Sequence, residues 1–288
     1  MSNLLEIRNV TKVYQRGLLS SHAKIALKEY NLTLKEDEPT ILTVAGESGS
    51  GKTTLAMLVL GFITPTTGEI LYRGKNITTL RGADRMAYRR EVQAVVQDPF
   101  AVFNPFYTGD HLLTVPIKQF KLAKSGRDAR NKMDEALTSV GLRPEDVLGR
   151  FPHQLSGGQR QRINVARALL LKPKLLIADE PVSMVDASLR ANILESLKNL
   201  HRDHGVTIIY ITHDLTTAYH VADTITVLYR GDVVEKGDVE TVIRNPQHAY
   251  TRLLVDSIPW PNLDQKWGQH SIRSKESQAE FHTEAPTP

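Results

Sequence analysis

The stretch "GESGSGKT", residues 46–53, decides the fold predicted for this chain. It fits the pattern G-x-x-x-x-G-K-[ST], and it lies between an apolar run at 41–46, typical of a buried strand, and a predicted helix at 52–62. Its three glycines let the backbone turn N–H groups inward around phosphate oxygens, at the positive end of the following helix. The sequence therefore predicts a phosphate-binding loop between a strand and a helix.

The side chains of this loop predict that it binds a nucleoside triphosphate together with a magnesium ion. Lys52 would neutralise the β- and γ-phosphates, and Thr53 would offer its hydroxyl to Mg²⁺. The alternative, a glycine-rich turn with an exposed lysine, does not explain why the pattern lies between a strand and a helix. We expect ATP to contact Gly46, Glu47, Ser48, Gly49, Ser50, Gly51, Lys52, Thr53 and Thr54.

Polar residues also stand where other predicted strands end. Asp179 closes an apolar run and Glu180 follows it, Gln97 ends a second run, and His213 follows a third. Parallel sheets carry their ligands at the carboxyl ends of the strands. A lone histidine at a strand end is more often structural, and only its place in this series favours a function. Asp179 would hold Mg²⁺ through water, and Glu180 would polarise the attacking water.

The order of elements indicates an α/β core. Residues 174–179 and 207–212 are continuous apolar runs, typical of parallel strands that are covered on both faces. Between them, apolar residues recur at helical spacing over 189–200, with Asp186 as a plausible N-cap. Strands that alternate with helices favour a doubly wound sheet.

The flanks of this core differ from it in character. Residues 4–14 alternate as a strand does, and a hairpin is predicted about Gly231. The polar helical stretches of 106–150 indicate a helical insertion between strands. The last residues, 263–288, have few aliphatic side chains and are predicted to be disordered.

Composition excludes several classes of site. The 288 residues include no cysteine, which removes disulfides, thiolate zinc sites and cysteine nucleophiles. The net charge of +4 comes from basic and acidic residues that are interleaved, so no nucleic-acid surface is expected. The N-terminus has no secretory signal and no apolar run reaches eighteen residues, which predicts a protein that is soluble or at most peripheral to a membrane.

A second glycine pair, in "LSGGQRQR" at 155–162, needs its own explanation. Ser156, Gly157 and Gly158 begin a predicted helix, where a hydroxyl, free N–H groups and a positive dipole end can face a phosphate. A loop that Ser156 merely caps would have the same local geometry. One nucleotide needs only one phosphate loop, so this second site suggests a second nucleotide.

The six motifs together resemble those of the nucleotide-binding subunit of ABC transporters, and the resemblance runs from about residue 4 to 260. In the order of that family they are Walker A "GESGSGKT", Q-loop "VVQDP", signature "LSGGQRQR", Walker B "LLIADEP", D-loop "SMVDAS" and switch "ITHD". The family packs two subunits head to tail, so the resemblance implies that Ser156, Gly157, Gly158 and Gln159 face the ATP of a partner subunit.

The resemblance also implies roles for single residues. Tyr14 would stack on adenine, and Asp186 would link the two subunits. Gln97 would sense Mg²⁺ and the permease, and His213 would contact the γ-phosphate. The catalytic set is thus expected to be Lys52, Gln97, Glu180 and His213, with Thr53, Gln97 and Asp179 at the metal.

Finer features are similar to the dipeptide and oligopeptide importer branch. "QDPFAVFNP" is close to the form usual in that branch, and "NPQHAYTRLLVDSIP" resembles its C-terminal extension. The departures are Val102 and Phe103, Ala249 where Pro is usual, and a D-loop with Met184 and Val185. Related subunits serve peptides, nickel or oligosaccharides, so the solute stays open. We expect an importer ATPase on the cytoplasmic face of the membrane, with permease subunits, a solute-binding protein and a second ATPase, a copy or a paralogue, as partners. The alternatives are a soluble ABC ATPase that acts on nucleic acid or ribosomes, and an exporter ATPase.

The fold expected from the resemblance is a P-loop NTPase (RecA-like) core with an N-terminal antiparallel β region and an inserted helical subdomain. The core would comprise 1–97 and 161–244, and the helical subdomain 98–160. Residues 245–262 would form an importer-type extension. Apolar side chains at Phe100, Val102 and Phe103 would either receive a permease helix or pack the insertion onto the core.

Overall fold

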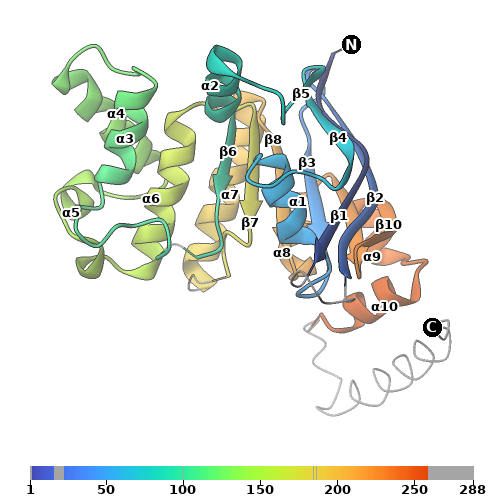
Figure 1. Cartoon of the computed structure of the whole chain (residues 1–288). Coiled ribbons are helices and arrows are strands. Elements are labelled where there is room, and N and C mark those ends of the chain that lie inside the picture. The colour runs from blue at the N-terminus through green and yellow to red at the C-terminus, as the bar shows by residue number, and fades with distance from the viewer. Residues whose placement is uncertain (1, 16–22, 99, 184, 186, 259–288) are drawn as a thin grey trace, which may run out of the picture.

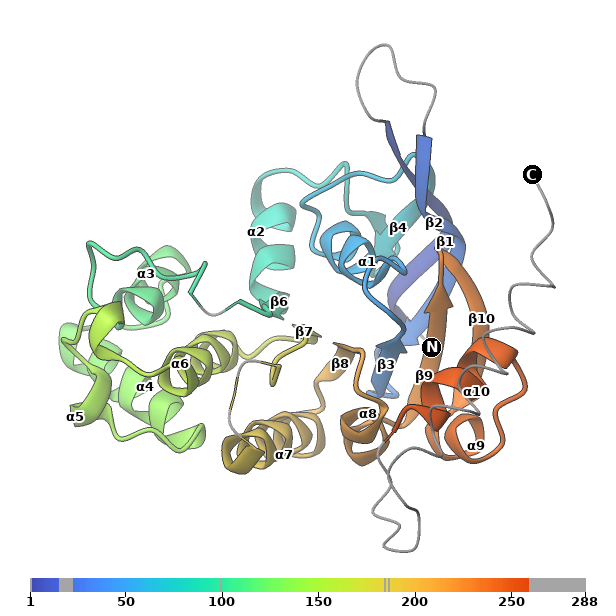
Figure 2. The same cartoon turned by 90° about the horizontal axis from the view of Figure 1, so that it is seen from below.

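The computed structural model describes residues 2–15, 23–98, 100–183, 185 and 187–258 (Figure 1). Asp186, Met184 and the predicted disordered tail lie outside these described residues, as do the last four residues of the predicted extension. Two sheets stand side by side, and a group of helices lies at one side of them (Figures 1 and 2). No described helix combines the length and the apolar character needed to cross a bilayer.

The N-terminal sheet is antiparallel, with the order β2-β1-β4-β5. Its strands are β1 (Asn3–Gln15), β2 (Ala23–Lys35), β4 (Thr67–Tyr72) and β5 (Lys75–Asn76). The pairing of β1 with β2 shifts register near Asn9 and Glu29, both at positive φ, as at β-bulges. This irregular alternation explains why only β1 is recognisable in the sequence, whereas the antiparallel region itself is as expected.

The second sheet has the order β10-β9-β3-β8-β7-β6, and its central strands are parallel. The strands are β3 (Ile41–Ala45), β6 (Val92–Val95), β7 (Leu175–Asp179), β8 (Thr207–Thr212), β9 (Thr224–Tyr229) and β10 (Asp232–Asp238). Every residue of β3 and β8 is buried, which is why these strands read as continuous apolar runs. β9 and β10 form the hairpin expected about Gly231.

Helices cover both faces of this sheet. Helix α1 (Lys52–Val59) lies between the two sheets, because its Leu55 and Leu58 share one apolar cluster with Leu5 of β1 and Ile177 of β7. The other helices along the sheet are α6 (Gly157–Leu170), α7 (Ala187–His204), α8 (Leu215–Val221), α9 (Val239–Arg244) and α10 (Ala249–Asp256). The doubly wound core is therefore present.

The helical region stands beyond the β6 edge of the sheet (Figures 1 and 2). It comprises α3 (His111–Gln119), α4 (Gly126–Ser139), α5 (Pro144–Val147) and the 3-10 turn η1 (Pro152–Gln154), while α2 (Gly82–Glu91) precedes β6. Helix α6 joins this region to the core, since Leu137 of α4, Ile163 of α6 and Leu176 of β7 belong to one cluster. The boundary predicted at residues 160 and 161 falls inside α6.

Candidate functional site

The phosphate loop connects β3 to α1, and two of its glycines have no room for a side chain. Gly46 has φ 149°, and a Cβ there would lie 2.2 Å from the carbonyl oxygen of Leu228. Gly51 has φ 115°, and its Cβ would lie 2.3 Å from the carbonyl oxygen of Ala26. Both φ values lie in the region that favours glycine. Close backbone contacts with β2 and β9 therefore restrict these two loop positions to glycine.

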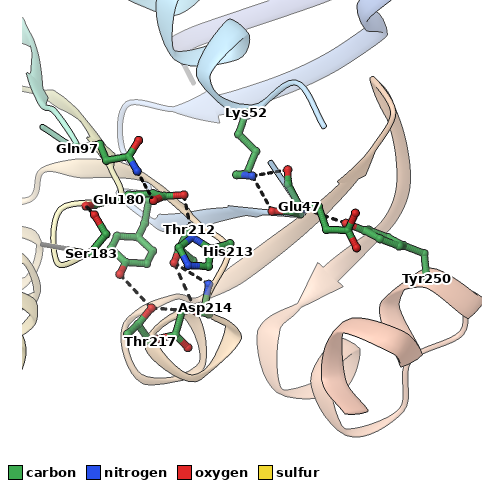
Figure 3. A network of polar contacts seen from close by, with 12 residues as sticks. Glu47, Lys52, Gln97, Glu180, Ser183, Thr212, His213, Asp214, Thr217 and Tyr250 are labelled. Carbon is green, nitrogen blue, oxygen red and sulfur yellow. Dashed lines mark hydrogen bonds and ion pairs between the residues drawn. The ribbon is translucent and has the colours of Figure 1, made fainter. Parts of the chain in front are cut away.

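Lys52 is buried inside the loop that it ends. Its Nζ donates to the carbonyl oxygens of Gly46 (2.6 Å) and Glu47 (2.7 Å) (Figure 3). Burial lowers the pKa of this amine, while the charges of Glu180, Asp179 and Glu47 act to raise it. An anion bound in the loop would give the buried cation the counter-charge that its surroundings supply only in part. The loop therefore fits a polyphosphate.

Glu180 lies where three parallel strands end. One carboxylate oxygen accepts from Nε2 of Gln97 at 2.7 Å, and the other lies 2.8 Å from Nδ1 of His213 (Figure 3). An ionised carboxylate only accepts, so Nδ1 of His213 carries the proton in this contact. The Glu180 backbone has φ 45°, and its N–H donates to Ile211 of β8. The residues predicted from β6, β7 and β8 are thus brought together at one edge.

Asp179 and Thr53 form the pair predicted for magnesium. Burial raises the pKa of Asp179 to about 6, helped by the Glu180 charge, whereas the Lys52 charge and a hydrogen bond from Thr53 act to lower it. Mg²⁺ is usually bound by one or two carboxylates together with phosphate oxygens and water. Among the described residues no cluster of three His, Asp or Glu could hold a metal unaided. The site therefore fits Mg²⁺ that arrives with a phosphate ligand.

The Asp179 pKa leads to a prediction about stability without nucleotide and metal. The folded chain keeps the Asp179 proton up to about pH 6, while the unfolded chain loses it near its ordinary value, 3.8. Between these values the folded state binds more protons, so the ionisable Asp179 destabilises the fold increasingly as pH rises through this window. Asp179→Asn should therefore gain stability over wild type from pH 4 to pH 7, by about 2 kcal/mol when partial solvent screening is allowed for. Urea unfolding of both chains at the two pH values checks this. If the free energies of unfolding of Asp179→Asn and wild type differed by the same amount at pH 4 and pH 7, the raised pKa of Asp179 would be contradicted.

The signature residues begin α6 in a capping box. Ser156 Oγ accepts from the Gln159 N–H at 3.1 Å, and Gln159 Oε1 accepts from the Ser156 N–H at 2.9 Å. Ser156 is exposed, and Gly157 and Gly158 are half-buried. Figures 1 and 2 show α6 beside the helical region and α1, which begins at the chain's own phosphate loop, beside the N-terminal sheet. The geometry leaves this helix start open to another molecule.

Tyr14 lies at the far end of β1, with 41% of its surface exposed. It pairs with Lys24 of β2, whose Nζ would lie 4.0 Å from a Cβ on Gly49. The exposed ring therefore lies on β1, next to the strand β2 that reaches the loop, and its stacking on adenine stays a prediction. Lys24 is a further candidate for contact with phosphate that the sequence did not reveal, because β2 carries no clear strand pattern.

The sequence matches a known protein family and resembles proteins of known name. The model of the family described as "ABC transporter" matches residues 27–183. The oligopeptide transport ATP-binding protein OppF of Salmonella typhimurium is 38% identical over 233 residues, 81% of this chain and 70% of that protein. The chain belongs to the ABC transporter family. Like other ATP-binding subunits of that family, it is an ATPase coupled to transport.

Further matches extend over the C-terminal part and the fold. The family "Oligopeptide/dipeptide transporter, C-terminal region" matches residues 234–284. The dimeric ATP-binding cassette MJ0796, bound to ADP and Pi, superposes with a TM-score of 0.73 and 31% identity over 82% of this chain and 98% of that chain. CbiO1 of Clostridium perfringens superposes with a TM-score of 0.69 and 27% identity, over 85% of this chain and 92% of that chain. The ABC cassette fold is confirmed. The oligopeptide transporter C-terminal region and the OppF relatives favour an importer subunit over a nucleic-acid ATPase or an exporter.

Proposed function

We propose that this ABC subunit hydrolyses Mg·ATP to drive oligopeptide import through a separate permease. The observation that carries the proposal is Glu180, held between Gln97 and His213 beside the loop that contains Lys52. The importer-type C-terminal region and the relatives named for oligopeptide transport support the solute class. Nickel and oligosaccharides are the competing solutes.

The proposed roles follow from the contacts. Lys52 would move its charge from two carbonyl oxygens to the β- and γ-phosphates. Glu180 would accept a hydrogen bond, and then the proton, from a water that attacks the γ-phosphorus while the bond to the β-phosphate oxygen breaks. His213 would hold Glu180 in place and reach the γ-phosphate. Magnesium, held by Thr53 and through water by Asp179 and Gln97, would neutralise charge on the phosphates.

The second half of each ATP site would come from another ATPase subunit. Exposed Ser156, with Gly157 and Gly158, offers a helix N-terminus to the γ-phosphate of the partner's ATP. A dimeric relative of the same fold supports the pairing of two subunits. Asp186 would join the interface. The partner is either a second copy or a paralogue.

The permease is proposed to bind in a groove between the core and the helical region. A cavity of about 1100 Å³ opens there, lined by Val102 and Phe103 together with Phe62, Tyr107 and Val115. Arg81, Arg85, Arg89 and Arg167 also line it, and no Asp or Glu does so within the described part of the chain. A short permease helix with apolar and acidic side chains would fit such a surface. This docking would place the subunit peripherally on the cytoplasmic face of the membrane.

The absence of cysteine makes a sharp test of the docking possible. Val102→Cys should crosslink to single cysteines in the cytoplasmic loops of the permease, because Val102 lines the groove. The matched control is Thr138→Cys, an exposed position on α4 outside the groove. Crosslinked bands on gels of membranes that still transport are the readout. Equal yields from both positions, or none from Val102, would contradict the docking.

The solute class is tested with the assembled transporter in proteoliposomes. Peptide-loaded binding protein should stimulate phosphate release, and labelled oligopeptide should accumulate on the opposite side with ATP. Binding proteins for nickel and oligosaccharides, with their solutes, serve as matched competitors. Stimulation by one of these instead of the peptide would overturn the solute class and leave the ATPase assignment standing.

A further inference from the structure

A tyrosine from the C-terminal extension reaches the phosphate loop. The Tyr250 hydroxyl, on α10, accepts a hydrogen bond from the backbone N–H of Glu47 at 2.8 Å, across 203 residues of sequence (Figure 3). Tyr250 is only 1% exposed, and the bond is half-buried because Glu47 lies at the surface. None of the roles proposed so far uses the extension, and this bond joins it directly to the loop.

The bond falls on the same peptide group that holds Lys52. The Gly46–Glu47 peptide donates its N–H to Tyr250 and accepts from the Lys52 Nζ through its carbonyl oxygen, at 2.8 and 2.6 Å. A peptide group is planar, so fixing the direction of its N–H also fixes the direction of its C=O. Tyr250 therefore orients the carbonyl against which the Lys52 amine rests.

Helix α10 is itself firmly attached to the hairpin. Glu235 of β10 accepts from the backbone N–H groups of Gln247 and His248 at 2.9 and 3.0 Å, just before α10. The Tyr250 ring packs on Tyr229 of β9, with 4.3 Å between centroids. At the hairpin turn, the Gly231 N–H donates to the carbonyl oxygen of Ser50 at 2.9 Å. The C-terminal part thus holds the loop at two points.

We propose that Tyr250 is a positioning residue through which the C-terminal extension sets the affinity of the phosphate loop for ATP. This inference rests on the proposed function, because it takes ATP to be the ligand of the loop. The coupling is reciprocal, since what α10 does for ATP binding, ATP binding does for the docking of α10. A partner that pulls α10 from the loop would lower ATP affinity, and ATP would strengthen the docking of α10.

The first test is Tyr250→Phe, which keeps the ring packed and removes the hydroxyl. Without its acceptor the Glu47 N–H loses its partner, and the Gly46–Glu47 peptide is no longer fixed in the loop that receives the phosphates. We therefore expect Kd and KM for ATP to rise about fivefold to tenfold with kcat changed less than twofold. The matched control is Tyr219→Phe. The Tyr219 hydroxyl accepts from Arg244 near the surface, so its removal should leave KM unchanged. Calorimetry and phosphate release provide the constants. Unchanged Kd and KM in Tyr250→Phe would overturn the inference.

The second test is made on the wild type first and then on Tyr250→Phe. Hydrogen exchange of the wild type should slow in α10 when ATP is added, relative to α4 in the helical region, and Tyr250→Phe should lose most of this difference. No ATP-dependent protection of α10 in the wild type would overturn the inference.

Lys52→Ala distinguishes failure of the proposed function from failure of this inference. If Lys52→Ala binds ATP as the wild type does, the proposed function fails. If Lys52→Ala loses ATP affinity while Tyr250→Phe keeps it, only the role of Tyr250 is refuted.

Discussion

Glu180→Gln should lower kcat for ATP hydrolysis by a hundredfold or more while ATP binding stays within a few-fold of wild type. The amide has the size of the carboxylate but cannot take a proton from water, and general bases contribute about 10² to 10⁴ in rate. Lys52, Thr53 and Asp179, the residues proposed to hold Mg·ATP, are untouched. Phosphate release under saturating ATP gives kcat, and calorimetry gives the affinity.

The control for this variant is Glu69→Gln, an exposed carboxylate on β4 that pairs with Arg8. Exposed pairs contribute little, so kcat and stability should both stay near wild type. If Glu180→Gln hydrolysed ATP at half the normal rate or faster, the base would have to be sought elsewhere. Loss of ATP binding in Glu180→Gln would instead point to a structural role at its contacts with Gln97 and His213.

Lys52→Ala should remove ATP binding and hydrolysis almost entirely. The buried amine lies inside the loop, against the carbonyl oxygens of Gly46 and Glu47. Charge-assisted bonds to phosphate in such a site are worth on the order of 3–5 kcal/mol, about a hundredfold to a few thousandfold. We expect kcat/KM for ATP to fall by at least this factor. Titration calorimetry and phosphate release at several ATP concentrations are the measurements.

Two comparisons make the Lys52 result specific. Lys132→Ala removes an exposed lysine on α4 that pairs with Asp128, and its kinetics should match wild type. Thermal unfolding without nucleotide should show that Lys52→Ala folds, since the amine rests on carbonyl oxygens that water can reach once the side chain is gone. Turnover close to wild type in a folded Lys52→Ala chain would refute the assignment of the phosphate loop.

Much of the site could be predicted from sequence because its residues stand at strand ends with strong local patterns. Asp179 and His213 close fully apolar runs, and these runs are β7 and β8. Parallel strands bring such residues to one edge without knowledge of the loops. Ser156 could be predicted to begin a helix because a serine followed by a glutamine at the third position forms a capping box.

Other parts of the site depend on contacts between distant segments, which no local pattern records. Lys24 reaches Gly49 through an irregular strand pair with shifted register. Tyr250 could be assigned to a family-like extension, but its bond to Glu47 depends on how α10 packs against β9 and β10. Two arginines of the groove, Arg85 and Arg89, lie on α2, and Arg81 directly precedes α2. Arg167 lies on α6, on the other side of the helical region in the sequence. Their common surface exists only in the folded chain.

The most direct test of an ATP site completed by a second subunit is the mass of Glu180→Gln particles by light scattering, with Mg·ATP or Mg·ADP. The chain is measured alone and together with the second ATPase subunit of its transporter. We predict a dimer with ATP, no dimer with ADP, and loss of the ATP dimer when Ser156→Arg is added, although that chain still binds ATP on its own loop. A single-chain mass with ATP in both settings, or an ATP dimer that survives Ser156→Arg, would contradict a site completed by the signature of a second subunit.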